Sequence, residues 1–260
     1  MYNEGFALTG EANFMNDIGE NVVVNTGLAG YSISIFFPCY NEGENVERVV
    51  VKAVEVLRGV SDDFEVIIVD DGSSDGTREI SDRLAGEIEE VVVIRHETNL
   101  GYGSALQTGF LAASKELVFY TDGDGQFDIA EMPGLIGLMD EYDIVSCYRL
   151  NRKEGLVRKL NAWCWGKLVC FVFGMKLRDI DCAFKLFKRK IFDDIEMQST
   201  GALIDAEILA RSLKKGYTIV QRGVRHYPRV AGSSTGANLS VILRAFKELL
   251  RLRKEINREA

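Results

Sequence analysis

Leu117-Val118-Phe119-Tyr120-Thr121-Asp122-Gly123-Asp124-Gly125-Gln126 is the stretch of this 260-residue chain that decides its fold class. Its apolar first half is typical of a buried strand. The two carboxylates follow where the strand should leave the sheet, and in open α/β sheets that edge is where ligands bind. Two carboxylates separated by one glycine can turn toward one hard cation, which commonly bridges to phosphate oxygens as Mg²⁺ does. The stretch therefore indicates an α/β protein that handles a phosphorylated ligand.

Strand and helix patterns alternate on both sides of this stretch. Apolar strands are predicted at 33–37, 64–69, 91–94, 117–121 and 142–147, with helices at 45–57, 77–88 and 104–113 between them. Continuous apolar strands that alternate with helices are typical of a mostly parallel sheet with helices on both faces. The second half is less regular, with predicted helices at 202–214 and 239–252 and predicted strands at 217–221 and 224–227. We expect a flexible or accessory extension over 1–30, one α/β domain over 31–236 and an amphipathic C-terminal helix over 237–260.

Composition excludes several classes of function. A formal net charge of −8 disfavours nonspecific binding of nucleic acid, so no nucleic-acid partner is expected. The five cysteines form no Cys-x-x-Cys motif and the two histidines lie far apart, which argues against a disulfide framework and against a zinc site. The start lacks the basic region of a signal peptide, and no apolar run reaches the ~20 residues that cross a bilayer. These patterns predict a cytoplasmic protein.

Three predicted strands end in acidic or polar clusters. The first is followed by Pro38-Cys39-Tyr40-Asn41-Glu42, the second by Asp70-Asp71-Gly72-Ser73-Ser74-Asp75-Gly76-Thr77, and the fourth by the two aspartates quoted above. Any one of these clusters could be an ordinary capped turn, since Asp, Ser and Gly favour turns. Three clusters at one edge of a parallel sheet favour a shared ligand site instead. Asn99-Leu100-Gly101-Tyr102-Gly103 precedes a predicted helix, where glycines let the backbone approach a diphosphate.

In their order and spacing, these motifs resemble those of glycosyltransferase family 2. They are most similar to the branch that includes dolichyl-phosphate mannose synthases and related polyprenyl-phosphate sugar transferases, and the resemblance covers residues 32 to 235. It implies a GT-A fold and an inverting transfer of a hexose from a GDP- or UDP-linked sugar. It also implies an acceptor, which in this branch is a polyprenyl phosphate at the cytosolic face of a membrane.

The resemblance assigns roles to the residues at the strand ends. Those expected to hold the nucleotide are Pro38, Tyr40, Glu42, Asp70 and Asp122. Asp122 and Asp124, together with Gln126, are expected to hold Mg²⁺ or Mn²⁺ on the diphosphate, and Asp124 is also counted as catalytic. Breaking the anomeric C–O bond leaves a nucleoside diphosphate with growing negative charge, so a metal held by carboxylates would stabilise the leaving group.

Arginines in the second half suggest where a phosphate acceptor binds. Arg149 ends Ser146-Cys147-Tyr148-Arg149, which is similar to the branch's Gly-Ser-Arg element, and Arg229 and Ser233 lie in a stretch similar to its Arg-x-x-Gly-x-Ser element. Arg158 lies in the next helical region. The guanidinium fork suits phosphate because it donates two hydrogen bonds. We expect these residues to form the acceptor-phosphate pocket, with Arg149 and Arg229 acting in catalysis. The alternative is that each arginine is a solvated surface charge.

Two other functions stay open at this point. A phosphate acceptor is already ionised near neutral pH, whereas a hydroxyl acceptor on a glycan or small molecule needs a general base. Asp205 and Glu207 stand where many family members carry an acidic element, and they are the residues expected to supply such a base. A non-catalytic protein that binds a sugar nucleotide is the third alternative. The C-terminal helix and the stretch 163–173 have the pattern of segments that lie in a lipid interface, although such helices more often pack on their own domain.

Overall fold

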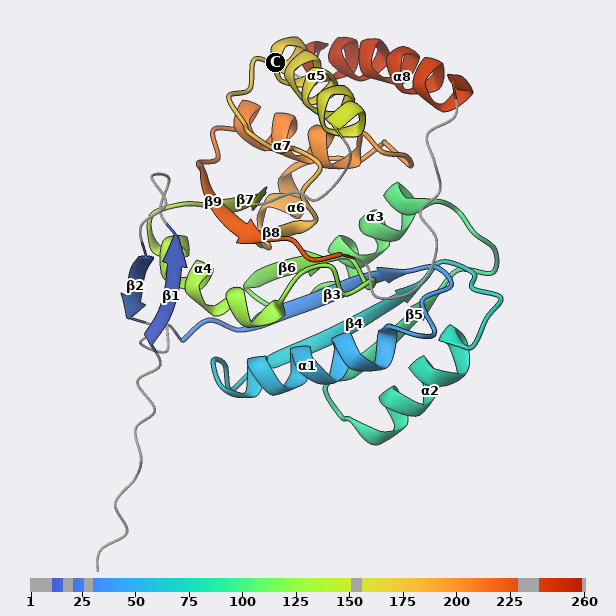
Figure 1. Cartoon of the computed structure of the whole chain (residues 1–260), viewed down its shortest axis with the longest axis vertical. Coiled ribbons are helices and arrows are strands. Elements are labelled where there is room, and N and C mark those ends of the chain that lie inside the picture. Colours follow the sequence, from blue (N-terminus) through green and yellow to red (C-terminus); the bar gives the residue numbers. More distant parts are fainter. Residues whose placement is uncertain (1–10, 16–20, 26–29, 151–155, 229–238, 259–260) are drawn as a thin grey trace, which may run out of the picture.

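A seven-stranded sheet forms the centre of the molecule (Figure 1). The computed structural model describes residues 11–15, 21–25, 30–150, 156–228 and 239–258. The strand order is β5-β4-β3-β6-β8-β7-β9. The strands are β3 (Ile33–Cys39), β4 (Phe64–Asp70), β5 (Val91–Arg95), β6 (Leu117–Thr121), β7 (Ile144–Leu150), β8 (Phe184–Lys188) and β9 (Ile219–Arg225).

The first half of the sheet is parallel, as the apolar strands predict. β3 pairs in parallel with β4 on one side and with β6 on the other, and all of its residues are buried. The register places Ile33 opposite both Phe64 and Leu117, and Cys39 opposite Asp70. The carboxyl ends of these strands therefore meet at one edge of the sheet, which is where ligands bind in open α/β folds.

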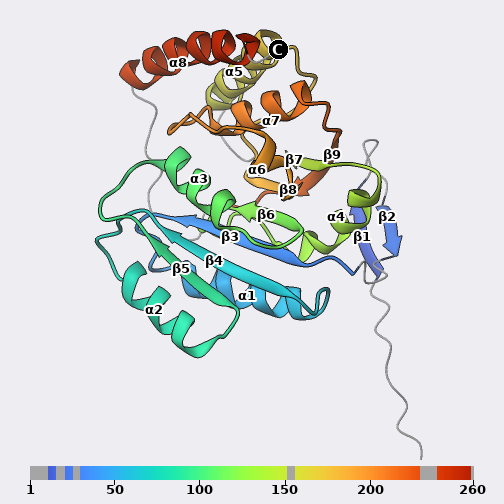
Figure 2. The ribbon, with the colours of Figure 1, turned by 180° about the vertical axis from the view of Figure 1, so that it is seen from behind.

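Helices cover both faces of the sheet. They are α1 (Val46–Arg58), α2 (Thr77–Glu87), α3 (Tyr102–Ala112), α4 (Pro133–Ile136), α5 (Leu156–Phe173), α6 (Ile191–Asp194), α7 (Ile204–Lys214) and α8 (Leu239–Arg258). α1 and α2 lie on one face, and α3 and α7 lie on the other (Figures 1 and 2). α5 and α8 form an outer layer beyond α7, where the Trp165 and Phe246 rings meet edge to face at 5.2 Å. The expected GT-A-like arrangement is confirmed.

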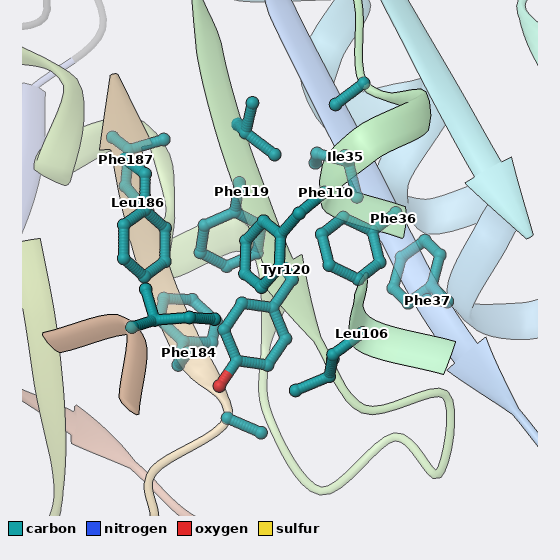
Figure 3. Close-up of a cluster of buried hydrophobic side chains, with 14 of the residues drawn as sticks. Ile35, Phe36, Phe37, Leu106, Phe110, Phe119, Tyr120, Phe184, Leu186 and Phe187 are labelled. Carbon is teal, nitrogen blue, oxygen red and sulfur yellow. The ribbon is translucent and has the colours of Figure 1, made fainter. Parts of the chain in front are cut away.

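Aromatic side chains fix α3 on the sheet (Figure 3). The Phe110 ring of α3 lies 4.8 Å from Phe36 of β3 and 5.4 Å from Tyr120 of β6, centroid to centroid. Pairs with such edge-to-face geometry contribute about 0.5–1.5 kcal/mol beyond the area they bury. Gly109 lets α3 come this close, because a Cβ atom there would collide with the Phe36 ring. The N-terminus of α3 is thereby held at the ligand edge.

The second half of the sheet differs from the prediction. β8 was not predicted, and it lies antiparallel between β6 and β7. Its sequence is Phe184-Lys185-Leu186-Phe187-Lys188, in which the lysines interrupt the apolar pattern of a buried strand. Lys185 is nevertheless buried in the core, where the Asp205 carboxylate neutralises its charge. The two strands predicted at 217–221 and 224–227 are one strand, β9, which pairs in parallel with β7.

Two further segments are the N-terminal extension and the predicted helical region that contains the stretch 163–173. The expected N-terminal extension contains β1 (Glu11–Met15) and β2 (Asn21–Asn25), which pair antiparallel. α5 is not a buried helix, because the side chains of Trp163 and Phe171 are 59% and 82% exposed. None of the helices in the described ranges combines the length and the apolar character that crossing a membrane requires.

Candidate active site

Hydrogen bonds join the loops that follow β3 and β4. Asn41 adopts a left-handed conformation with φ of 55°, and its backbone N–H donates to Ser73 Oγ at 3.0 Å. Its side-chain Oδ1 accepts from the Ser74 N–H at 2.8 Å, and the Gly43 N–H donates to Asp75 Oδ2 at 3.0 Å. The first two polar clusters therefore form one rigid rim, as their convergence at one sheet edge predicts.

The residues expected to hold the nucleotide sit in and beneath this rim. Pro38 lies within β3, and the side chain of Tyr40 just beyond it is 48% exposed. Glu42 is buried and accepts from Asn45 Nδ2 at 2.8 Å. Asp70 is buried and accepts from the Ser73 N–H at 2.9 Å. The exposed ring of Tyr40 offers a stacking surface, and the two buried carboxylates offer hydrogen-bond acceptors.

Asp71 organises the glycine loop, a role that the sequence analysis did not assign. Its buried carboxylate accepts from the backbone N–H groups of Leu100 and Gly101 at 2.8 and 2.9 Å, and it contacts His96 Nδ1 at 2.6 Å. His96 Nε2 contacts Thr108 Oγ1 at 2.9 Å. Gly101 has a φ of +98°, which side chains rarely adopt. Asp71 thus fixes the loop that leads into α3.

The two aspartates of the opening stretch meet the rim at the end of β3. A Cβ atom on Gly123, between them, would lie 2.7 Å from Cys39 Sγ, so only glycine fits without a shift. Asp122 Oδ1 accepts from the Tyr102 hydroxyl at 3.0 Å, and Asp124 Oδ1 accepts from the Gln126 N–H at 3.0 Å. The structure therefore brings Asp122 and Asp124 together with the other strand-end clusters.

The chemistry of this carboxylate pair fits a divalent cation. Burial and then the charge of Asp124 raise the pKa of Asp122 to about 7. A bound cation would relieve that repulsion. Across the described part of the chain, no three or more His, Cys, Asp or Glu side chains gather in a cluster able to hold a metal. A site of two carboxylates is typical of Mg²⁺, which completes its shell with water and substrate phosphates. The side chain of Gln126, the third expected ligand, donates to the Tyr227 carbonyl at 3.1 Å.

Asp205 and Glu207, the expected acidic pair, face different partners. Asp205 is buried and accepts from Lys185 Nζ at 2.7 Å and from the Tyr120 hydroxyl. Glu207 is fully buried and accepts from Ser199 N–H at 2.6 Å and from Arg211 Nε at 2.8 Å. Its oxygens also accept from the backbone N–H of Gln198. Neither carboxylate opens to solvent, and Glu207 holds the loop before α7.

Arg149 borders a cavity of about 490 Å³, here called the α5 cavity. Its guanidinium forms a two-pronged bond with Asp179, with Nε–Oδ2 and Nη2–Oδ1 distances of 2.7 and 2.8 Å. A guanidinium has five N–H donors, so this bond leaves three for other partners. The lining also includes Tyr148, Leu160, Trp163, Lys167 and Asp181. The cavity thus combines basic groups with an apolar wall from α5.

Asp181 is a further functional candidate that the sequence analysis left without a role. It opens to solvent on the wall of the α5 cavity. The protein packed around it removes part of its hydration, and this effect, followed by the charge of Asp205, raises its pKa to about 6. Sequence alone gives no signal for this shift in pKa, since it comes first from the protein packed around Asp181 and then from the charge of Asp205 on α7.

Three expected acceptor residues cannot be placed. Arg229 and Ser233 lie outside the described residues. Arg158 falls within the helical backbone of α5, but its side chain is likewise outside the described part. Their predicted roles stay predictions.

Comparison with known proteins agrees with this geometry. The family model described as Glycosyl transferase family 2 matches residues 34–196. The chain belongs to glycosyltransferase family 2. The matched range includes the rim formed by the first two polar clusters, the aspartate pair and β8.

Curated relatives of this family 2 glycosyltransferase include several enzymes named for polyprenyl phosphates. It is 31% identical to glycosyltransferase AglD of Haloferax volcanii over 215 residues, which are 77% of this chain and 34% of the relative. It is 29% identical to dodecaprenyl-phosphate galacturonate synthase of Rhizobium johnstonii, covering 66% of this chain and 52% of the relative. It is also 29% identical to undecaprenyl-phosphate 4-deoxy-4-formamido-L-arabinose transferase of Proteus mirabilis, and the match covers 81% of this chain and 64% of the relative. The chain thus spans from about a third to just under two thirds of these relatives.

Solved structures of the same fold include glucosyl-3-phosphoglycerate synthase from Mycobacterium tuberculosis. One crystal structure of that enzyme, with Mn²⁺, UDP-glucose and glycerol 3-phosphate, superposes with a TM-score of 0.66 at 18% identity. The superposition covers 88% of this family 2 glycosyltransferase and 80% of the solved chain. At this level of identity the likeness supports the fold alone.

Proposed function

We propose that this family 2 glycosyltransferase transfers a hexose, with inversion, from a nucleotide-diphosphate sugar to a polyprenyl phosphate. The observation that carries the proposal is the α5 cavity, in which the Arg149 guanidinium lies beside an exposed apolar helix face. Such a cavity suits a ligand with an anionic head and an apolar tail. The curated relatives named for polyprenyl phosphates support the same acceptor class.

On the donor side, the chain's residues would bind the nucleotide sugar at the rim. Tyr40 would stack on the base, and Glu42 and Asp70 would accept hydrogen bonds from the nucleoside. Asp122 and Asp124 would hold Mg²⁺ or Mn²⁺, which stabilises the charge of the departing diphosphate. The glycine loop fixed by Asp71 would bring backbone N–H groups of the α3 N-terminus to the diphosphate.

On the acceptor side, Arg149 would orient the lipid phosphate. Asp179 fixes the plane of its guanidinium, so the remaining N–H groups are presented in a set direction. An ionised phosphate oxygen would attack the anomeric carbon, and the bond from that carbon to the nucleoside diphosphate would break. No general base is required, which agrees with the pairing of Asp205 to Lys185.

A hydroxyl acceptor is the second candidate, and Asp181 is the observation that favours it. A solvent-accessible carboxylate with a pKa of about 6 on the cavity wall has the properties of a general base near neutral pH. In this alternative, Asp181 would take the hydroxyl proton as the oxygen attacks the anomeric carbon.

Peripheral contact with a membrane follows from the preferred acceptor. Leu160 and Trp163 line the cavity and are also exposed, and Phe171 lies exposed on the same helix. The neighbouring helix α8 exposes Leu250 beside basic residues such as Arg251. An apolar surface with basic neighbours suits the interface of an anionic bilayer. A lipid tail would enter the cavity from that side.

The test is a transfer assay with the full chain. A panel of radiolabelled GDP- and UDP-linked hexoses is mixed with polyprenyl phosphate, with and without Mn²⁺, and label is followed into the organic phase. We expect transfer to polyprenyl phosphate and none to the matching polyprenol, which lacks the phosphate. Transfer to a hydroxyl acceptor alone would support the second candidate, and donor binding without transfer to either acceptor would indicate a non-catalytic protein.

The matched variants are Asp124→Ala at the proposed metal site and Asp193→Ala at an exposed acid that pairs with Arg189. We expect the first to abolish transfer and the second to leave it unchanged. Near-normal turnover of Asp124→Ala would remove the metal assignment.

A further inference from the structure

Tyr102 joins the glycine loop to the carboxylate pair at the sheet edge. It is the first residue of α3, and its hydroxyl donates to Asp122 Oδ1 at 3.0 Å. Asp122 directly follows β6, so this one bond connects the N-terminus of the helix to the end of the strand. A cation on Asp122 does not by itself require a tyrosine at this position.

Glycines fix the backbone on both sides of Tyr102. Gly101 has a φ of +98°, in the left-handed region that favours glycine. A Cβ atom on Gly103 would lie 2.4 Å from the backbone carbonyl carbon of Thr200, so only glycine fits there without a shift. The Gly103 N–H donates to the Thr200 carbonyl at 3.1 Å. The loop before α7 therefore holds the backbone on the C-terminal side of Tyr102.

Asp71 holds the backbone on the N-terminal side. Its two carboxylate oxygens accept from the N–H groups of Leu100 at 2.8 Å and Gly101 at 2.9 Å, the two residues that precede Tyr102. The same carboxylate contacts His96 Nδ1 at 2.6 Å, and the side chain of Asp71 is buried. A buried carboxylate with these partners has little freedom to turn. The position of Tyr102 is therefore set by contacts within the protein.

The bond from Tyr102 restricts how the Asp122 carboxylate can turn. One oxygen accepts from the hydroxyl, and the other oxygen can serve a cation. A ligand group that is already oriented loses less freedom on binding, so its partners raise metal affinity. The side chain of Tyr102 is 38% exposed, so water could replace the hydroxyl as a donor, but the loop would not hold that water in place. The tyrosine thus supplies a direction as well as a hydrogen bond.

We propose that Tyr102 is a positioning residue for the cation site, held in place by Asp71 and orienting the Asp122 carboxylate through its hydroxyl. The inference rests on the proposed function, because it assumes that Asp122 binds Mg²⁺ or Mn²⁺ on a diphosphate. Tyr102 itself touches neither the cation nor the reacting atoms. The glycine loop then has a task within the protein, in addition to the approach of its backbone to the diphosphate.

The test measures binding of Mn²⁺ to the full chain by electron paramagnetic resonance of the free ion, with UDP and with GDP in separate titrations. Tyr102→Phe keeps the ring and removes only the hydroxyl. Tyr31→Phe is the matched control, because the Tyr31 hydroxyl also donates to an aspartate, Asp140 Oδ1 at 2.8 Å, but lies before β3, at the other end of that strand from the ligand edge. Asp71→Asn, alone and combined with Tyr102→Phe, tests whether Asp71 acts through Tyr102.

We expect Tyr102→Phe to weaken Mn²⁺ binding by about tenfold, the size of effect found for residues that orient metal ligands. Its melting temperature should stay within about 4 °C of the wild type, and Tyr31→Phe should bind Mn²⁺ normally. Asp71→Asn should also weaken Mn²⁺ binding. It should add no further loss to Tyr102→Phe, because both changes act on Asp122 through the same hydroxyl.

Wild-type affinity for Mn²⁺ in Tyr102→Phe overturns the inference, even if Asp71→Asn fails to fold. An equal loss in Tyr31→Phe also overturns it, since that hydroxyl lies at the other end of the strand. Losses from Asp71→Asn and Tyr102→Phe that add in full would overturn the part given to Asp71. If the wild-type protein binds no Mn²⁺ with either nucleotide, the proposed function fails together with the inference. If it binds Mn²⁺ and Tyr102→Phe binds it equally well, only the inference fails.

Discussion

Replacing Glu207 by glutamine should destabilise the protein without removing its chemistry. Glu207 is fully buried, and its carboxylate accepts from two backbone N–H groups and from Arg211. Glutamine keeps the shape and one acceptor oxygen but loses the charge. We therefore expect the variant to lose stability because the buried Arg211 guanidinium loses the negative charge of Glu207 beside it.

The size of the effect follows from burial. Arg211 is only 2% exposed, so water has little access to its guanidinium when the charge of Glu207 is removed. Removing one partner of a buried ion pair costs about 3–5 kcal/mol. Adding Arg211→Met removes the remaining charge while the glutamine oxygen still accepts from the backbone, so the double variant should be more stable than Glu207→Gln alone.

The assay is urea unfolding, combined with the transfer assay at a temperature where every variant is folded. We expect the free energy of unfolding to fall by about 3–5 kcal/mol and the turnover number to stay within about threefold of the wild type. A variant with unchanged stability whose turnover falls about a hundredfold would refute this reasoning, since that is the loss expected for a general base.

Three more predictions concern the site. Gly123→Ala should lower stability by about 1–3 kcal/mol, because its Cβ would meet Cys39 Sγ at 2.7 Å, and adding Cys39→Ala should recover part of the loss in urea unfolding. The pKa of Asp122 is raised to about 7, so between about pH 4 and pH 7 Asp122 keeps its proton in the folded state but is ionised in the unfolded state. The free energy of unfolding should therefore fall as pH rises from about 4 to 7, and this contribution should stay constant above pH 7. Asp122→Asn should flatten that part of a profile of melting temperature against pH recorded without metal. Arg149→Lys should raise the KM for polyprenyl phosphate by about tenfold because lysine cannot form the two-pronged bond to Asp179. The same change at Arg189, a half-exposed arginine that pairs with Asp193, should leave KM unchanged.

The first half of the fold could be predicted because apolar residues dominate each of its strands. β3 and β6 are buried on both faces, as is β4 from Val66 onward, and the ends of these strands were predicted to within two residues. The convergence of the polar clusters followed from parallel pairing alone. The predicted domain limits at residues 31 and 236 stay a prediction.

The second half could not be predicted in the same way, because its polar residues take part in the core. β8 contains two lysines, and nothing in the local pattern says that Lys185 is neutralised by a carboxylate on α7. The separation of Asp205 from Glu207 has the same origin, since neighbouring positions on a helix face different parts of the protein. The role of Asp71 depends on a loop about thirty residues further along the chain.

β8 lies between β6 and β7 in the sheet but follows both in the chain, and this order has a consequence for biosynthesis. β6 pairs with β3 on one side, but its other edge stays open until residues 184–188 are available. A nascent chain that has reached only β7 would therefore expose unpaired strand edges, which are templates for aggregation. The sequence pattern of residues 31–150 is typical of a self-contained nucleotide-binding half, but the sheet topology shows that this region is not an independent folding unit. Truncated chains that end before β8 should therefore accumulate as insoluble protein.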